Sequence, residues 1–263
     1  MITVEIRKQF FRVRTYVGMG LVALIPIILA ATFKANPPQG SGGFFDLSTS
    51  GAMNVAVTAL TEVSAFLLIV VVSLFAGETV AGEAEWGTLR YLLIRPVTRN
   101  RLLAAKLLVS VLLALLATFL VILVALAIGT PLFGWHSLEV PGLTALSSSQ
   151  ALERLALATV YVAWCQAAYI SFAFMLSTMT DRAFAAVAGG VGLGVVSQIL
   201  NNISSLNGTS YIYPTHYLNF WQHLFFGSPQ TVDLIRGVLW QLPYVVVFLG
   251  IAWWSFNRKD VLS

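Results

Sequence analysis

Charged side chains gather between residues 77 and 106, although the flanking sequence is almost entirely apolar. Three carboxylates come first and five basic side chains follow: Glu78, Glu83, Glu85, then Arg90, Arg95, Arg99, Arg101 and Lys106. Such groups can form ion pairs with a protein or bind the phosphates of lipid headgroups. The order of the charges therefore predicts a segment with a protein-facing part followed by a lipid-facing part.

Common catalytic patterns are missing from the sequence. No lysine follows a glycine, so there is no GxxxxGK[ST] motif to bind nucleotide phosphates, and neither GxSxG nor HExxH occurs. The three histidines, His136, His216 and His223, all fall in predicted outer loops, and the single cysteine, Cys165, can form no intrachain disulfide. We expect a chain that is not an enzyme and that binds no metal or cofactor itself.

Composition predicts a membrane protein. Hydrophobic residues make up 58% of the 263 residues and charged residues 10%, with a mean hydropathy of +0.83, which is more apolar than a soluble core requires. Six segments approach the roughly twenty residues that cross a bilayer. They lie near Tyr16 to Phe33, Val55 to Ala76, Leu102 to Ile128, Leu155 to Met179, Phe184 to Leu200 and Val238 to Phe256. The predicted fold is an all-α, polytopic membrane protein with six transmembrane helices in a single domain, residues 1–263.

The basic residues predict how the chain is oriented. With both termini inside, twelve of the fifteen lysines and arginines are cytoplasmic, and only Lys34, Arg154 and Arg236 lie outside. This bias agrees with the positive-inside rule and with an even number of spans, N-in and C-in. The bases lie beside apolar spans, which favours contact with anionic lipid and argues against nucleic-acid binding, despite a pI of about 9.4.

Two flanking segments have amphipathic patterns. In residues 1–15, Ile2, Ile6, Phe10 and Val13 share one helical side, and Arg7, Lys8, Arg12 and Arg14 are available to phosphates. This predicts an interfacial helix, with an ordinary basic flank as the alternative. Residues 201–235 form an extracytoplasmic aromatic loop, in which Tyr217, Phe220, Trp221, Leu224 and Phe225 have helical spacing. The spacing predicts a short helix at the outer membrane face, and structural anchoring and a lid over an exit path both remain open for this loop.

The charged segment also contains a specific pattern. Its sequence fits E-x(4)-E-x-E-x-G-T-L-x-x-L-L-x-x-P-V-x-R from Glu78 to Arg99 and is followed by Ala104-Ala105-Lys106 and an apolar span. Here the chain resembles the permease subunits of ATP-binding cassette transporters of the type-2 class (ABC-2), which include bacitracin-exporter and sodium-extrusion members. The six-span layout and the amphipathic start are also similar to that family.

The resemblance implies a function for residues 77–101, as the cytoplasmic coupling loop that inserts into a groove of a separate ATPase. The implied coupling residues are Glu78, Glu83, Glu85, Trp86, Gly87, Thr88, Leu89 and Arg90. It also implies P-loop ABC ATPase subunits as partners, with ATP and Mg bound on those subunits, and a second permease copy, identical or paralogous. The location implied is the inner cell membrane of a bacterium. Without a partner, the same acids would only balance neighbouring bases on a solvated face.

Within the spans, two features are candidates for function. Ala186, Gly190 and Gly194 form a small-xxx-small ladder, which packs helices within the chain or forms a dimer or translocation interface. Glu62 lies in the outer half of the second predicted span, where it contacts a substrate path or pairs with Arg154 or Arg236.

The predicted function is that of an ABC exporter permease. A non-transporting membrane scaffold or sensor, which docks a cytoplasmic partner through the same loop, is the main alternative. A secondary transporter is a third hypothesis, although no internal two-fold repeat is visible.

Overall fold

The computed structural model describes residues 2–38, 43–87, 98–226 and 231–259. Within these ranges the chain is helical, with no strand, and six helical stretches are long and apolar enough to cross a membrane. The predicted all-α, six-span fold is therefore confirmed. The helices are α1 Ile2–Phe10, α2 Val13–Ala35, α3 Ala52–Ala65, α4 Leu67–Glu85, α6 Arg99–Phe133, α7 Ser148–Cys165, α8 Ala167–Met179, α9 Ala183–Asn201 and α10 Thr231–Arg258, with 3₁₀ helices η1 Ser204–Ile212 and η2 Phe220–Leu224.

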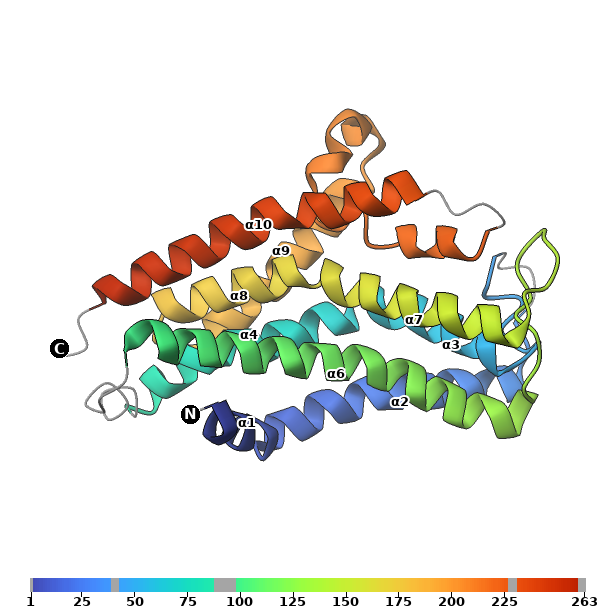
Figure 1. Ribbon diagram of the computed structural model, residues 1–263, viewed down its shortest axis with the longest axis horizontal. Helices are drawn as coiled ribbons and strands as arrows, with labels where there is room; N and C mark the ends of the chain where they lie inside the picture. The colour runs from blue at the N-terminus through green and yellow to red at the C-terminus, as the bar shows by residue number, and fades with distance from the viewer. Residues whose placement is uncertain (1, 39–42, 88–97, 227–230, 260–263) are drawn as a thin grey trace.

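The helices run roughly along one long axis (Figure 1). Helix α1, the C-terminal ends of α4 and α10 and the start of α6 lie at one end of this axis (Figure 1). We call it the inner end because the charge pattern predicts it to be cytoplasmic. The opposite end is the outer end. At 35 residues and about 1.5 Å per residue, α6 is about 50 Å long and exceeds the hydrocarbon thickness.

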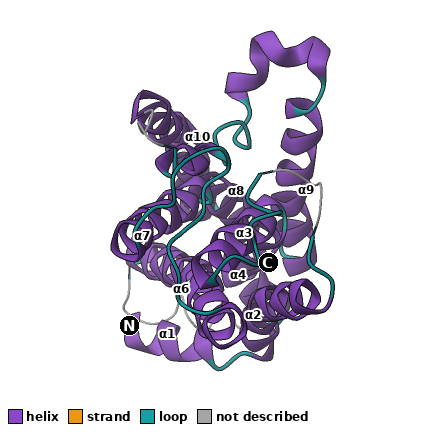
Figure 2. Cartoon of the chain, turned by 90° about the vertical axis from the view of Figure 1, so that its right-hand side faces the viewer, coloured by secondary structure: helices purple, strands orange, loops and turns teal. Residues whose placement is uncertain are grey.

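Two apolar clusters form the core. One lies toward the outer end and joins α2, α3, α6, α7 and η2 around Leu60, Val121 and Trp221. The other joins α4, α6, α8 and α10 around Val72, Phe174 and Phe256. Helix α4 contacts α6, α8 and α9 and lies inside the bundle when viewed along it (Figure 2). A displacement of α4 would therefore also displace the helices that pack against it.

The second and fourth predicted spans are each interrupted between two helices, and the helix long and apolar enough to be the second span is α4 alone, Leu67–Glu85. Phe66 separates α3 from α4 with φ −140° and ψ −53°, outside the α region, and Gln166 separates α7 from α8. The predicted second span, Val55 to Ala76, was therefore misplaced, because the apolar stretch is interrupted and the helical path continues to Glu85. The fourth span was predicted only from Leu155, whereas α7 begins at Ser148.

The small residues of α9 lie against α4. A β-carbon built on Gly190 would lie 2.6 Å from Ser73 Oγ, and one on Gly194 would lie 2.6 Å from Ile69 Cγ2. From the other side, a β-carbon on Gly77 would lie 3.1 Å from the carbonyl carbon of Ala186. The ladder thus has a partner helix within the same chain, as the packing interpretation requires.

We expect Gly190→Val to lower the free energy of unfolding by about 1–3 kcal/mol, because the added branches would overlap Ser73 and Ala173. Gly192→Val is the matched control, since nothing lies within 4 Å of a β-carbon at that position. Thermal unfolding of both variants in the same detergent measures the difference. Equal midpoints would show that the α4–α9 contact is not close.

The aromatic loop, predicted for residues 201–235, is only partly as expected. The predicted short helix forms as η2, but Trp221 and Phe225 are buried in the core and do not lie on the membrane surface. The loop is attached to the bundle by hydrogen bonds, including one from the Tyr161 hydroxyl to the Tyr217 carbonyl oxygen at 2.9 Å. These contacts favour the anchoring interpretation over a mobile lid.

Candidate partner-docking site at the inner end

The charged segment begins inside a helix. Glu78 and Glu83 belong to α4, which ends at Glu85, so the coupling loop predicted for residues 77–101 starts about two turns later than expected. Gly87 has a φ of +65° and its N–H bonds to the Ala84 carbonyl oxygen at 2.9 Å, as is typical of a helix that ends at a left-handed glycine. The predicted coupling residues Thr88, Leu89 and Arg90 lie outside the described residues.

Glu83 lies at the centre of a buried charge cluster. Its side chain is 1% exposed and its carboxylate contacts the amino groups of Lys8 in α1 and Lys106 in α6, the latter at 2.7 Å. Lys106 is fully buried, lies 3.5 Å from a carboxylate oxygen of Glu5 and donates a hydrogen bond to the Thr79 carbonyl oxygen. Opposite charges with several hydrogen bonds offset one another's desolvation. We call Glu5, Lys8, Glu83 and Lys106 the inner charge cluster.

The other two glutamates connect α4 to further helices. Glu78 pairs with Arg14 in α2. The Glu85 carboxylate accepts a hydrogen bond at 3.1 Å from the backbone N–H of Ala183, the first residue of α9, where a negative charge complements the helix dipole. Together, the three glutamates join the end of α4 to α1, α2, α6 and α9.

This arrangement corrects the expected role of Glu83. Glu83 was expected on a surface that meets a partner, whereas the structure buries it against residues far away in the chain. Glu83 therefore acts as an internal link between helices and presents no charge to an approaching protein. Glu85 is exposed and holds α9 at the same time.

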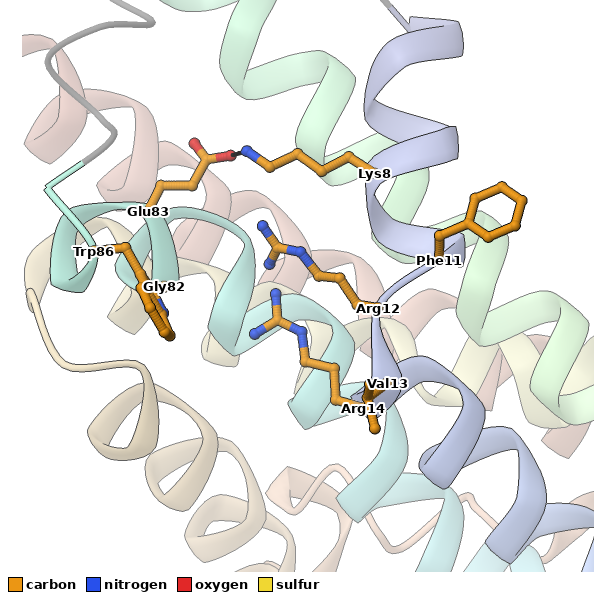
Figure 3. A pocket seen from close by; sticks show the side chains of 8 residues that line it. All are labelled: Lys8, Phe11, Arg12, Val13, Arg14, Gly82, Glu83 and Trp86. Atoms are coloured by element: carbon orange, nitrogen blue, oxygen red, sulfur yellow. Dashed lines mark hydrogen bonds and ion pairs between the residues drawn. The ribbon is translucent and has the colours of Figure 1, made fainter.

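Trp86 is an exposed apolar group at the end of α4. Its side chain is 82% exposed directly after the last residue of α4, and Figure 3 shows the ring beside Gly82 at the mouth of a pocket. A tryptophan in this position can fill a groove on another protein, where large aromatic side chains contribute most to binding. The structure thus keeps Trp86 available, as the predicted coupling role requires.

Several basic residues that were predicted to meet lipid phosphates make contacts within the chain. Lys8, Arg14 and Lys106 are engaged in the ion pairs above. Arg99 bonds instead to carbonyl oxygens at the end of α10, including those of Asn257 at 3.1 Å and Lys259 at 3.0 Å. Thr98 occupies the N-cap position of α6, but its side chain makes no capping hydrogen bond.

The buried side of the N-terminal helix α1 differs from the side that was predicted. Glu5 and Gln9 form its buried side, and Ile6 and Phe10 pack partly against the core. Val13, predicted on the same stripe, is exposed. A kink at Phe11 and Arg12 turns the chain from α1 into α2, and the Thr15 hydroxyl secures this turn by donating to the Gln9 carbonyl oxygen at 2.6 Å.

Glu62 lies far from this site, in α3 toward the outer end. It is exposed and lines a cavity of about 280 Å³ with Phe44 and Phe226. Neither predicted pairing forms, because Arg154 donates to the Leu224 carbonyl oxygen and Arg236 pairs with Asp233. Its assignment to a substrate path stays a prediction.

The ion pairs that bring Glu5, Lys8, Arg14 and Lys106 into the site were not predicted from the sequence. A signal existed for Lys106, because a lysine deep in an apolar helix needs a carboxylate partner. In the described part of the chain, no three histidine, cysteine, aspartate or glutamate side chains are close enough to hold a metal ion.

The fold and the site define a six-span helical membrane protein whose second span ends in a charge cluster below an exposed tryptophan. A family model described as "Protein of unknown function (DUF2705)" matches residues 21–262, so the chain belongs to the DUF2705 family. It is also similar to the "Uncharacterized membrane protein YdbK" of Bacillus subtilis (strain 168), at 25% identity over 268 residues that cover 97% of this chain and 99% of the relative. The relative's name agrees with the membrane-spanning fold, and neither description states an activity.

Proposed function

We propose that this chain is the membrane-spanning permease of an ATP-driven transporter of the ABC-2 type, and that it works as an exporter. Its ATPase is a separate polypeptide that binds ATP and Mg, and two permease copies enclose the path. The resemblance of Glu78 through Arg99 to the ABC-2 coupling segment motivates the proposal. The six candidate spans are consistent with it.

The observation that carries the proposal is the linkage at the end of α4. An exposed tryptophan follows a helix end that is ion-paired or hydrogen-bonded to α1, α2, α6 and α9. A coupling element must receive a push at one point and pass it to several spans as a rigid unit. Trp86 supplies the point of contact, and the three glutamates supply the rigid connection.

The mechanism follows from this geometry. Closure of the ATPase upon ATP binding displaces the segment beyond Trp86, and α4 moves with it because its last turns have no independent freedom. The ion pairs then carry α1, α2, α6 and α9 along, which changes access from the inner to the outer side. The chain itself contributes no group to ATP hydrolysis.

Co-purification tests the proposal. The tagged chain is extracted from its own membranes in mild detergent and the retained proteins are identified by mass spectrometry. We expect a P-loop ABC ATPase in near-stoichiometric amount. Recovery of the chain with no ATPase, or with an ATPase whose hydrolysis is unaffected by removal of the chain, would favour the scaffold alternative.

A further inference from the structure

A pocket of about 580 Å³ lies between the kink that joins α1 to α2 and the end of α4. Figure 3 shows three basic side chains directed toward α4, Lys8 from α1, Arg12 from the kink and Arg14 from α2. Its lining residues are Lys8, Phe11, Arg12, Val13, Arg14, Gly82, Glu83 and Trp86. The proposed function assigns no ligand to this space.

The basic side chains around the pocket outnumber the carboxylates by one. Lys8 and Arg14 are paired with Glu83 and Glu78, and Lys106 lies between Glu83 and Glu5. The backbone of Arg12 bonds to its chain neighbours, whereas its guanidinium makes no hydrogen bond or ion pair with any residue that the structure describes. The two arginines and two lysines around this site therefore face three carboxylates, and the surplus positive charge resides on Arg12.

Arg12 is also partly removed from water. Burial lowers the pKa of its guanidinium below the ordinary value, and the neighbouring carboxylates of Glu83 and Glu5 oppose this shift. Arginine stays charged under these conditions. In addition, the Nη2 atom of Arg14 is buried without a hydrogen-bond partner among the described residues. Two guanidinium groups can thus donate to an anion in this pocket.

Apolar side chains beside the pocket are exposed on the surface of the bundle. Phe11 and Val13 are largely exposed, and they lie where the chain enters the first span. Exposed apolar side chains then continue along α2, namely Tyr16, Val17, Leu21, Leu24, Ile27 and Ile28. The acyl chains of a lipid would cover this apolar strip along α2, whereas a free phosphate or an acidic peptide would not contact it.

We propose that this pocket binds the phosphate-bearing headgroup of an anionic membrane lipid. Arg12 is the principal contact, Arg14 Nη2 is a second donor, and the acyl chains lie along the exposed side of α2. Binding neutralises the surplus charge and fixes the kink between α1 and α2. The proposal depends on this chain alone and is independent of any ATPase.

Native mass spectrometry of the delipidated, full-length chain tests the site. The chain is titrated with phosphatidylglycerol, phosphatidylcholine or inorganic phosphate. We expect selective binding of phosphatidylglycerol that becomes at least about tenfold weaker in Arg12→Gln, because a charged donor is lost. Arg12→Lys retains most of the affinity. Arg7→Gln is the matched control, since Arg7 is exposed on the same segment and does not line the pocket.

Three results would overturn the proposal. They are equal binding of phosphatidylglycerol and phosphatidylcholine, unchanged phosphatidylglycerol binding in Arg12→Gln, or competition by millimolar inorganic phosphate that displaces the lipid completely. If Arg12→Gln instead keeps its lipid but loses a co-purifying protein, the pocket receives a protein carboxylate and the lipid assignment is wrong. Unfolding midpoints of all variants show whether each is folded.

Discussion

Lys106→Met lowers the free energy of unfolding by about 3–5 kcal/mol, because it leaves Glu83 and Glu5 buried without their shared cation. Methionine fills most of the space of the lysine stem, so the loss reports on charge more than on packing. In thermal unfolding of the purified chain, we expect a midpoint at least about 6 °C lower than that of the unaltered chain.

Two further variants separate charge from volume. Lys106→Met combined with Glu5→Gln recovers a large part of the loss, because Glu5 is the buried carboxylate left without a cation, whereas Glu83 still contacts Lys8. Arg101→Met alters an exposed base in the first turn of the same helix and changes the midpoint little. If Lys106→Met is as stable as Arg101→Met, the inner charge cluster does not hold α4 to α6.

Trp86→Ala is expected to weaken retention of the ATPase by about thirtyfold or more, as loss of a central aromatic contact typically does. The folded chain itself is unaffected, because 82% of the Trp86 side chain is exposed. The measurement is the amount of ATPase that co-purifies as its concentration is varied.

The matched control for this variant is Trp135→Ala. Trp135 is also an exposed tryptophan, but it follows α6 at the outer end. We expect unchanged ATPase retention in Trp135→Ala and unchanged unfolding midpoints in both variants. Full retention in Trp86→Ala would remove this residue from the docking surface.

The fold was largely predictable because hydropathy and charge bias are local properties of the sequence. The first span was placed within three residues at its start, at Tyr16 in the prediction and Val13 in the structure. The end of the second span was misjudged because Glu78 and Glu83 resemble a loop when read alone. They stay helical since cations from other helices neutralise them.

The site was only partly predictable, because its ion pairs join residues that are far apart in the sequence. Lys8 and Glu83 are 75 positions apart in the chain, and no spacing rule in a single sequence indicates such a contact. Trp86, in contrast, was named in advance because it lies in the segment that resembles the ABC-2 coupling loop, and the structure leaves it exposed. The local sequence pattern thus indicated the exposed part of the site, and the three-dimensional structure supplied its buried connections.

The central claim is that the inner end, at Trp86, meets a separate ATPase. A photo-crosslinking amino acid placed at position 86 in living cells tests this most directly, with a second probe at position 123, an exposed site within the α6 span. The proposal predicts an ultraviolet-dependent adduct between position 86 and a protein with a P-loop ABC ATPase domain, and no such adduct from position 123. Adducts from position 86 that contain only lipid, or only proteins without a nucleotide-binding domain, would contradict it.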